Sequence, residues 1–386
     1  LLLVAHHIAV DGWSCKILNQ ELGVLYEGIL HGREPVLPDL PIQYADYAAW
    51  QRNETRNNEL DQELEYWRTK LEGLSPTLNL PTSSSQPTDE AFSGGKVPIM
   101  ILEETAARVH EVASKLNITP FMVLASAVMV TLYRYTGETD IAIGIPIAGR
   151  THFETESLVG LFVNTLVLRG DLSGQPSFVE ALQRVKSVCI EAYGHQETPF
   201  ERIVAELAAE RNEDRSPIVQ VMLAYWNLRS EPLRLAGMES TAIKVGTDTS
   251  KFDLSFSLGE TAEGLAGTLV YSLRLFNEDR MHDLAAHFVR LLEASVMEPE
   301  LAIGRMPMLS ASERKRIVVD WNAATAPEPE ERTLHGLFER AAAATPQATA
   351  VVCGDDSLTY GDLNERANHV AYYLRGLGVQ ADELVG

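Results

Sequence analysis

The sequence predicts a mixed α/β (α+β) fold, because stretches with helical periodicity are interspersed with short apolar runs typical of strands. Two helix starts are marked especially clearly. Ser177 and Glu180 form a capping box, and Thr119-Pro120 supplies an N-cap followed by a first-turn proline. The 386 residues suit two or three units at roughly 150 residues each, and the 45% of hydrophobic residues is enough for packed cores.

The first part of the chain predicts one strand and then helices. Leu1–Ala5 is a short apolar run that we interpret as a strand buried on both faces. An aromatic-rich segment over 42–52 leads into a polar helix that reaches Trp67, and residues 75–95 have the Ser, Pro, Thr and Gly content of a long connection. Between strand and connection, a helix from about Ser14 carries one apolar stripe, formed by Ile17, Leu18, Leu22, Leu25 and Ile29.

The middle of the chain, from about residue 97 to residue 299, alternates helices and strands. The helix that begins at Pro120 is almost wholly apolar, which predicts deep burial. The other predicted helices and strands are helices over 104–116 and from 178 to about 194, strands over 140–147, 218–225, 252–258 and 267–276, and a closing helix with its apolar stripe over 281–292.

Composition narrows the function classes. With 54 acidic and 32 basic residues the net charge is -22, which disfavours nucleic acid and membrane surfaces as partners. Cys15, Cys189 and Cys353 lack CxxC spacing, so the sequence indicates neither a zinc site nor a disulfide framework and favours the reducing cytoplasm. The longest apolar stretch, Pro120–Val130, is too short to span a bilayer.

The segment His6–Ser14, with sequence HHIAVDGWS, is the strongest candidate for chemistry, because it lies between the predicted first strand and the helix that follows. A histidine there can take a proton from a nucleophile, since its ordinary pKa is about 6.5. Asp11 can fix the turn or hold a partner cation, and Gly12 removes a side chain where the backbone turns tightly or approaches a substrate.

Three simpler interpretations of this segment compete with the chemical one. His6 and His7 alone could be one packed and one surface residue, and Asp11-Gly12 alone could be only a turn. HxxxD spacing can also supply two metal ligands. No third ligand stands nearby with helical or hairpin spacing, so we predict no metal. The conjunction of HHxxxDG with Trp13 and Ser14, between a strand and a helix, outweighs these alternatives.

The motif HHxxxDGWS resembles the active-site motif of condensation domains of nonribosomal peptide synthetases, which are relatives of chloramphenicol acetyltransferase. Further motifs of the family follow in the same order over nearly the whole chain. They are 44–52 (YADYAAWQR), 143–150 (IGIPIAGR), 159–165 (VGLFVNT) and 195–201 (HQETPFE). A last motif, 211–217 followed by 219–222, matches imperfectly, because Asn212 and Asp214 replace the usual Asp and Ser.

This resemblance implies a two-lobe fold like that of chloramphenicol acetyltransferase, here lacking the front of its N-lobe. The expected divisions are a condensation domain over 1–300, with 1–80 as the rest of the N-lobe and 81–300 as the C-lobe, and a linker over 301–332. Residues 333–386 resemble the start of an adenylation domain, with Leu358–Leu363 matching its first conserved segment.

The activity implied by the resemblance is amide-bond formation between a donor acyl or peptidyl thioester and an acceptor aminoacyl thioester. Both would be tethered to phosphopantetheine arms of upstream and downstream carrier domains, with the adenylation domain as a further partner in the same chain. No cofactor is expected to bind directly, and ATP with Mg²⁺ is expected only for a complete adenylation domain. We expect this stretch of chain to be inactive by itself.

The resemblance also assigns roles to residues. His7 is the catalytic residue, as a general base or as a hydrogen-bond acceptor that orients the amine, and this choice stays open. His6, Asp11 and Gly12 are structural. We expect an arginine from a preceding stretch to brace Asp11, with Arg150 as the less favoured candidate. The residues expected to line the cleft are Trp13, Ser14, Asn164 and Asp253.

Four other functions are weighed against condensation. An epimerising relative shares the histidine motif, but its motif lacks GWS and it is not usually followed by an adenylation start. A heterocyclising relative carries an aspartate pattern absent here. Intact His7, Asp11 and Gly12 argue against a catalytically silent carrier-docking module. The linker and the adenylation start argue against a free-standing acyltransferase that uses coenzyme A thioesters.

Overall fold

The computed structural model divides the chain into two compact units, Leu1–Ser310 and Ala311–Gly386. It describes the backbone alone for 54–57, and it describes in full residues 1–53, 58–82, 92–207, 216–226, 233–241, 243, 248–323, 333–380 and 383–385. Residues 211–215 of the imperfect motif, with Asn212 and Asp214, and residues 324–332 of the expected linker therefore lie outside the described residues.

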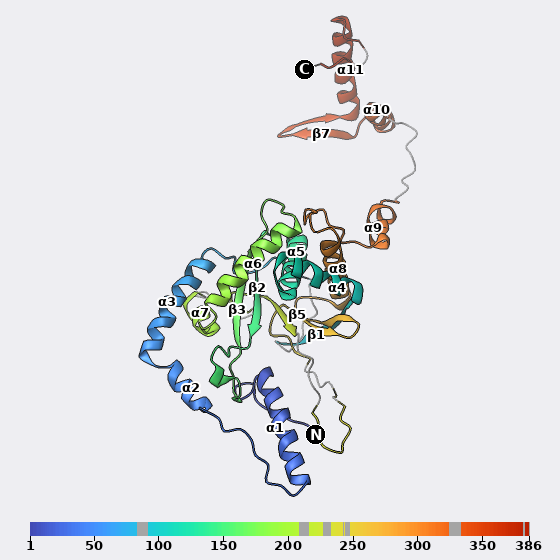
Figure 1. Cartoon of the computed structure of the whole chain (residues 1–386). Helices are drawn as coiled ribbons and strands as arrows, with labels where there is room; N and C mark the ends of the chain where they lie inside the picture. The colour runs from blue at the N-terminus through green and yellow to red at the C-terminus, as the bar shows by residue number, and fades with distance from the viewer. Residues whose placement is uncertain are drawn as a thin grey trace. The chain divides into compact units, whose positions relative to one another are not determined.

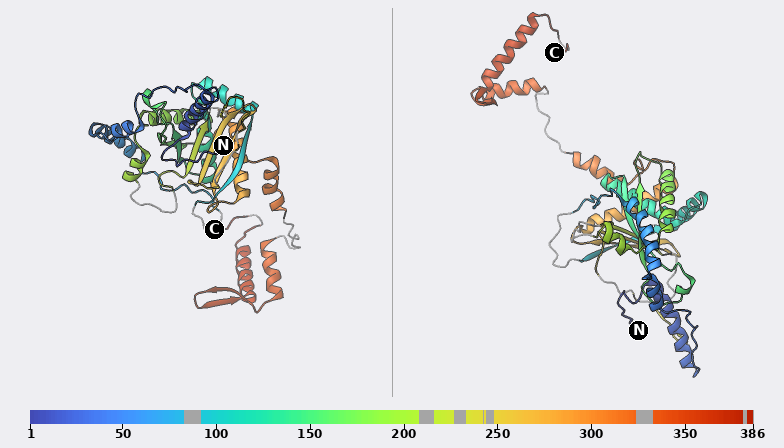
Figure 2. Two further views of the ribbon diagram at one scale, coloured as in Figure 1. Left: turned by 90° about the horizontal axis from the view of Figure 1, so that it is seen from below. Right: turned by 90° about the vertical axis from the view of Figure 1, so that its left-hand side faces the viewer.

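A six-stranded sheet in the order β1-β6-β5-β4-β2-β3 forms the centre of the first unit. Strand β4 runs parallel to β5 and β2, and the other neighbouring pairs are antiparallel. Figure 2 shows strands of this sheet side by side. The strands are β1 (Gly94–Leu102), β2 (Asp140–Ile147), β3 (Asn164–Asp171), β4 (Val221–Trp226), β5 (Leu254–Thr261) and β6 (Gly264–Ser272). The predicted mixed α/β class is confirmed.

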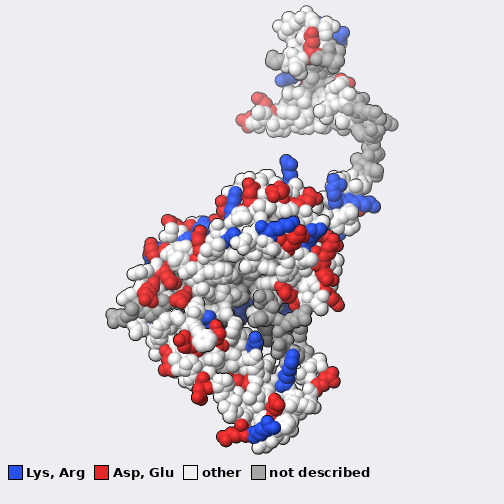
Figure 3. All heavy atoms as spheres, viewed as in Figure 1, with Lys and Arg blue, Asp and Glu red and all other residues white. Residues whose placement is uncertain are grey.

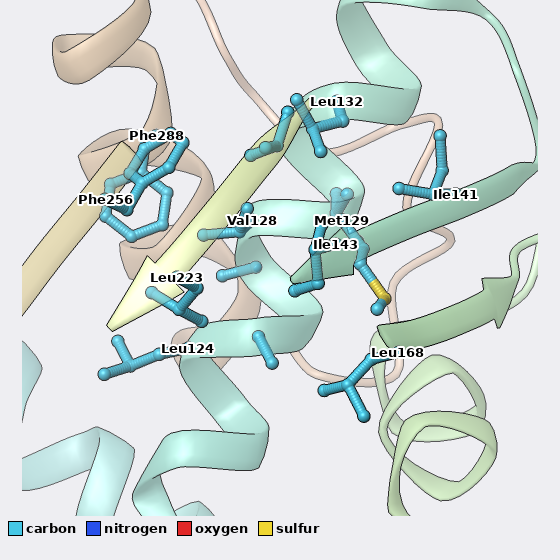
Figure 4. Packing of buried hydrophobic residues seen from close by; sticks show 14 of the residues in the cluster. Leu124, Val128, Met129, Leu132, Ile141, Ile143, Leu168, Leu223, Phe256 and Phe288 are labelled. Carbon is cyan, nitrogen blue, oxygen red and sulfur yellow. The ribbon is translucent and has the colours of Figure 1, made fainter. Parts of the chain in front are cut away.

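One face of this sheet is packed against α4 (Glu103–Leu116), α5 (Pro120–Thr136), α6 (Phe178–Gly194) and α8 (Glu278–Met297). Every residue of α5 from Met122 to Leu132 is buried, as its apolar sequence predicts. Figure 4 shows side chains of α5 among those of β2, β3 and β4, with Phe256 of β5 beside Phe288 of α8. Their ring centroids are 5.2 Å apart.

The predicted helix starts are confirmed. The Thr119 side chain accepts a hydrogen bond from the Met122 N–H at the first turn of α5. Ser177 and Glu180 form the reciprocal capping box of α6. Within the described residues, no single helix is long and apolar enough to cross a membrane, and α4 with α5 meets that test only as a pair bent by 108°.

The front of the chain contains helices α1 (Gly12–Leu30), α2 (Tyr44–Gln51) and α3 (Glu54–Leu71), and no strand among its described residues up to residue 80. The predicted strand Leu1–Ala5 is wrong. These residues pair with none of the described strands, and Leu1 and Val4 are 88% and 86% exposed. An apolar run becomes a buried strand only where neighbouring strands satisfy its backbone groups. Helix α1 projects from the body of the unit in Figure 1.

The first unit extends beyond residue 301, where the sequence predicts the linker to begin. Residues 301–310 belong to the folded unit, because Ile303 and Met306 are buried in its core.

The first unit also contains α7 (Phe200–Leu207) and the 3-10 turn Phe153–Thr155. The second unit contains α9 (Ala311–Val318), the 3-10 turn Asp320–Asn322, α10 (Leu334–Ala344), the antiparallel pair β7 (Thr349–Cys353) and β8 (Asp356–Thr359), and α11 (Tyr360–Gly376).

Candidate functional site

The segment His6–Ser14 forms a turn that leads directly into α1. The Ala9 N–H donates to the His6 carbonyl at 3.0 Å, which closes the turn. Asp11 is the N-cap of α1, and its carboxylate accepts the Ser14 N–H at 2.8 Å. Because an N-cap side chain pairs with a helix donor that has no partner inside the helix, Asp11 fixes the turn to α1.

Asp11 is buried, with 3% of its surface exposed, among donors from two distant parts of the sequence. Its carboxylate accepts the Ser14 hydroxyl at 2.7 Å and the Phe162 N–H at 3.0 Å, and it pairs with the Arg150 guanidinium at 3.3 Å. Burial alone would raise the pKa of Asp11, but the hydrogen bonds from Ser14 and Phe162 and the charge of Arg150 hold this pKa below its ordinary value. The carboxylate is therefore stabilised in its charged form.

Arg150 is the residue that braces Asp11, and its side chain is only 2% exposed. Its guanidinium donates to the Ser14 hydroxyl at 2.9 Å and to the carbonyls of Leu158, at 2.9 Å, and Thr155. Arg150, the less favoured of the two expected candidates, therefore fills this role in the structure. Because 139 positions separate Arg150 from Asp11, no local pattern in the sequence pairs them.

Ser14 and Gly160 join the two segments at a second point. The Ser14 hydroxyl lies 2.9 Å from the Gly160 carbonyl and accepts the Gly160 N–H at 3.1 Å, while the Asp11 N–H donates to the same carbonyl at 3.2 Å. A Cβ atom at Gly160 would lie 2.2 Å from the Tyr44 ring. Ser14 is 0% exposed, so the structure places it inside this junction and not on the wall of a cleft.

His7 lies at the exposed end of the same turn. Its Nδ1 is 2.9 Å from the Val10 carbonyl. A carbonyl oxygen only accepts, so Nδ1 carries the proton, and the neutral ring has its free lone pair on Nε2. His6 has the opposite arrangement, because its Nδ1 accepts the Ile8 N–H at 3.1 Å. The neighbouring rings of His6 and His7 are thus held in different tautomers when neutral.

Gly12 is the first residue of α1, and its backbone does not lie in the left-handed region. A Cβ atom at this position would meet nothing within 4 Å. The turn itself therefore does not require glycine here. The sequence suggests two reasons for Gly12, a tight turn and the close approach of a substrate. The second of these stays a prediction.

The other residues expected to line a cleft differ in how exposed they are. Trp13 is 37% exposed, and its indole N–H donates to the Glu156 carbonyl at 2.9 Å. Asp253 is buried, immediately before β5. The Asn164 side chain holds the start of α7: its amide donates to the carbonyls of Gln196 and Thr198, and its Oδ1 accepts the N–H groups of Thr165 and Phe200.

A cavity of about 270 Å³ adjoins this junction, and neither His6 nor His7 lines it. Of the residues that the sequence predicts to line a cleft, Asn164 lines it, and the aromatic residues of segment 44–52 were a further visible signal. Within the described ranges, no group of three or more His, Cys, Asp or Glu side chains is placed to hold a metal ion. The residues that line the cavity are Tyr44, Tyr47, Trp50, Gln51, Leu60, Gly149, Thr151, Leu161, Phe162, Val163, Asn164, Gln196, Glu197, Pro199 and Glu201.

Comparison with known protein families shows which family has this sequence and fold. A family model described as "Condensation domain" matches residues 1–318, most of the chain. The chain belongs to the condensation domain family. A second model, described as "AMP-binding enzyme", matches residues 338–386. The condensation domain is therefore followed by the start of an AMP-binding domain, as the sequence motifs predict.

Curated relatives of this condensation domain are much longer proteins. Tyrocidine synthase 3 of Brevibacillus parabrevis is 37% identical over 385 residues, which cover 100% of this chain and 6% of that protein. Bacitracin synthase 1 of Bacillus licheniformis is 37% identical over 386 residues, covering 100% of the chain and 7% of the relative. The dimodular nonribosomal peptide synthase of Bacillus subtilis (strain 168) is 40% identical over 396 residues, covering 100% and 17%.

Solved structures with the same fold include domains and a multidomain protein. The X-domain from teicoplanin biosynthesis aligns with a TM-score of 0.72 and 26% identity, covering 79% of this chain and 71% of that one. A four-domain nonribosomal peptide synthetase bound to AMP and glycine aligns with a TM-score of 0.71 and 19% identity, covering 97% and 29%. This second likeness shows the fold alone. The predicted condensation fold is confirmed by these alignments.

Proposed function

We propose that the chain forms amide bonds between two carrier-tethered thioesters, as part of a longer nonribosomal peptide synthetase. Membership of the condensation domain family and the similarity to synthases of tyrocidine and bacitracin support this proposal. The observation that carries it is the exposed His7 ring, whose tautomer leaves Nε2 free to accept a proton.

In the proposed reaction the acceptor's α-amine attacks the donor thioester carbonyl. The C–N bond forms as the C–S bond breaks, and the proton lost by the amine passes through His7 Nε2 to the departing thiolate. A thioester is already activated, so positioning the amine and managing this proton are the main tasks. His7 acts either as the base or as a hydrogen-bond acceptor that orients the amine, and both roles need a neutral ring with a free lone pair on Nε2.

The buried junction supports this role by holding the loop that carries His7. Asp11, Ser14 and Arg150 tie the start of α1 to the segment 150–162 through charge-assisted hydrogen bonds. His6 and Gly12 are assigned positions in the loop and no part in proton transfer. Of the expected cleft-lining residues, Trp13 keeps that role in our proposal because it is partly exposed beside the loop.

The proposed partners follow from the reaction. Upstream and downstream carrier domains bring the substrates on phosphopantetheine arms, so the condensation domain needs no cofactor of its own. The start of an AMP-binding domain supports an adenylation partner in the same chain that uses ATP and Mg²⁺ when complete. The cytoplasmic location stays a prediction from the cysteine pattern.

Replacing His7 tests the proposal directly. In the full-length synthetase, His7→Ala should lower the rate of dipeptide formation between loaded carriers by about 10²–10⁴-fold, the usual contribution of a positioned acid or base. Mass spectrometry of the carrier-bound products measures this rate. The melting temperature should stay unchanged, because the ring is exposed and bonds only within its turn.

The matched control is His110→Ala, which removes another exposed histidine, on α4. This variant should retain the full rate of dipeptide formation. A His7→Ala synthetase that forms dipeptide as fast as the unaltered protein would refute the catalytic assignment. An unaltered synthetase that docks loaded carriers and forms no dipeptide would instead identify a silent docking module.

A further inference from the structure

The cavity beside α2 has an aromatic wall that is distinct from the His7 site. Four ring pairs form this wall, with centroids 4.8 Å apart for Tyr47 and Phe162, 5.2 Å for Tyr44 and Phe162, 5.7 Å for Tyr47 and Trp50, and 6.0 Å for Tyr44 and Tyr47. The Tyr44 hydroxyl donates to the Leu161 carbonyl at 2.9 Å, which fixes the orientation of its ring. The wall is therefore held in place by packing and hydrogen bonding.

The charged residues in the lining of this cavity are all acidic. Its lining contains two carboxylates, Glu197 and Glu201, and no lysine or arginine among the described lining residues. His152 lies at the edge, with its ring 4.9 Å from that of Trp50 and its Nε2 3.8 Å from Glu197. Acidic side chains are also spread over the face of the molecule shown in Figure 3, and the whole chain has a net charge of -22. The local field therefore attracts cations.

One member of the wall already contacts a cation. The guanidinium carbon of Arg150 lies 4.1 Å from the Phe162 ring centroid, although Arg150 itself does not line the cavity. Aromatic faces attract ammonium and guanidinium groups because the face of the ring carries negative potential. The same chemistry is available to a second cation that enters the cavity, with Glu197 and Glu201 supplying the opposite charge.

We propose that this cavity binds a basic side chain, arginine or lysine, presented by a partner polypeptide. Its volume of about 270 Å³ is slightly below the usual range for a complete small-molecule ligand, about 300–1,000 Å³, and suits a single long side chain. The methylene stem packs on the aromatic wall, and the charged head reaches the carboxylates. The proposal does not depend on the condensation reaction, because no residue assigned to proton transfer lines the cavity.

A ligand-detected NMR titration of the whole chain tests the proposal with small probes. Nα-acetyl-arginine amide should bind saturably, and the neutral isostere Nα-acetyl-citrulline amide should bind at least several-fold more weakly. Trp50→Leu should weaken the arginine probe about two- to fivefold, the size of a partly exposed cation–π contact. Glu201→Gln should weaken it by a similar factor, since it removes one lining charge.

The matched control is Glu206→Gln, on the same helix α7 but outside the cavity lining, and it should leave the affinity unchanged. A thermal melt of each variant shows whether it is folded. Equal affinity for the arginine and citrulline probes would overturn the proposal. So would equal losses from Glu201→Gln and Glu206→Gln. Binding of butylguanidinium without binding of the arginine probe would assign the cavity to free small cations and not to a polypeptide.

Discussion

The two ends of the His6–Ser14 turn differ in burial and in where their hydrogen bonds go. At one end, the side chains of His6 and His7 are exposed, and their hydrogen bonds stay within the turn. At the other end, Asp11 and Ser14 are buried and bond to a segment more than a hundred positions away. In our proposal, the reactive and the supporting functions of this short motif therefore lie in separate residues.

The cost of burial explains why the supporting end needs so many partners. A buried carboxylate loses its hydration, and only close donors and an opposite charge offset that loss. Asp11 has both, from Ser14, Phe162 and Arg150. Hydrogen bonds to an ionised group are shorter and stronger than neutral ones, so the network also fixes the direction in which α1 leaves the turn.

The largest expected effect comes from removing the buried cation. Arg150→Met should lower the free energy of unfolding by about 3–5 kcal/mol, the usual loss when one partner of a buried ion pair is left alone. Urea unfolding followed by circular dichroism measures this change. The exposed end of the turn should respond indirectly, through a lower condensation rate in the full-length synthetase.

The comparison for this variant is Arg108→Met, which breaks an exposed pair with Glu111 on α4. Surface ion pairs contribute little, because water screens them. We therefore expect the Arg108 variant to unfold at nearly the same urea concentration as the unaltered chain. If Arg150→Met were no more destabilising than Arg108→Met, the buried junction of Asp11, Ser14 and Arg150 would not stabilise the turn as we propose.

The sequence predicts the helices that cover the sheet well because their signals are local. The apolar run after Thr119-Pro120 indicates a buried helix, and the structure buries α5 from Met122 to Leu132. The capping box at Ser177 marks the start of α6 in the same way. In these cases the residues that decide the structure are neighbours in the chain, so pattern and propensity are sufficient.

The candidate site is less predictable because its decisive contacts are distant in sequence. Nothing local indicates that Arg150 pairs with Asp11, and the aromatic cavity forms only when segment 44–51 meets Phe162. Leu1–Ala5 fails for the same reason, since a strand depends on neighbours that its own residues do not specify. The motif resemblance identifies the candidate His7, whereas its supporting contacts come from the fold.

A pH series on Asp11→Asn tests the charge at the buried end of the turn, and we expect a smaller loss of stability than for Arg150→Met. Asp11→Asn keeps an acceptor oxygen but removes the charge, so at neutral pH it should cost about 1.5–3 kcal/mol of unfolding free energy, the range for hydrogen bonds to charged groups. The pKa of Asp11 is lowered by folding. Its contribution is therefore complete above the ordinary Asp value of about 4, and it disappears as the pH falls below that value through the lowered folded-state pKa.

Urea unfolding of both proteins between pH 7 and pH 3 measures this dependence. The gap in stability between the unaltered chain and Asp11→Asn should be constant down to about pH 4 and should shrink below it. Asp11→Asn combined with Arg150→Met should be less destabilised than the sum of the two single variants, because the two residues contact each other. A gap that stays the same at pH 3 would show that the charge of Asp11 is not stabilising.

The smallest expected effect concerns Gly12, which lies within the supporting end of the turn, between Asp11 and Ser14. Gly12→Ala should raise the free energy of unfolding by up to about 1 kcal/mol, because alanine favours helix and its Cβ meets nothing within 4 Å. Gly160→Ala is the matched control and should lose about 1–3 kcal/mol, since its Cβ would lie 2.2 Å from the Tyr44 ring. If substrate approaches the backbone at Gly12, condensation by the more stable Gly12→Ala synthetase should slow, and a full rate would leave this glycine without a function.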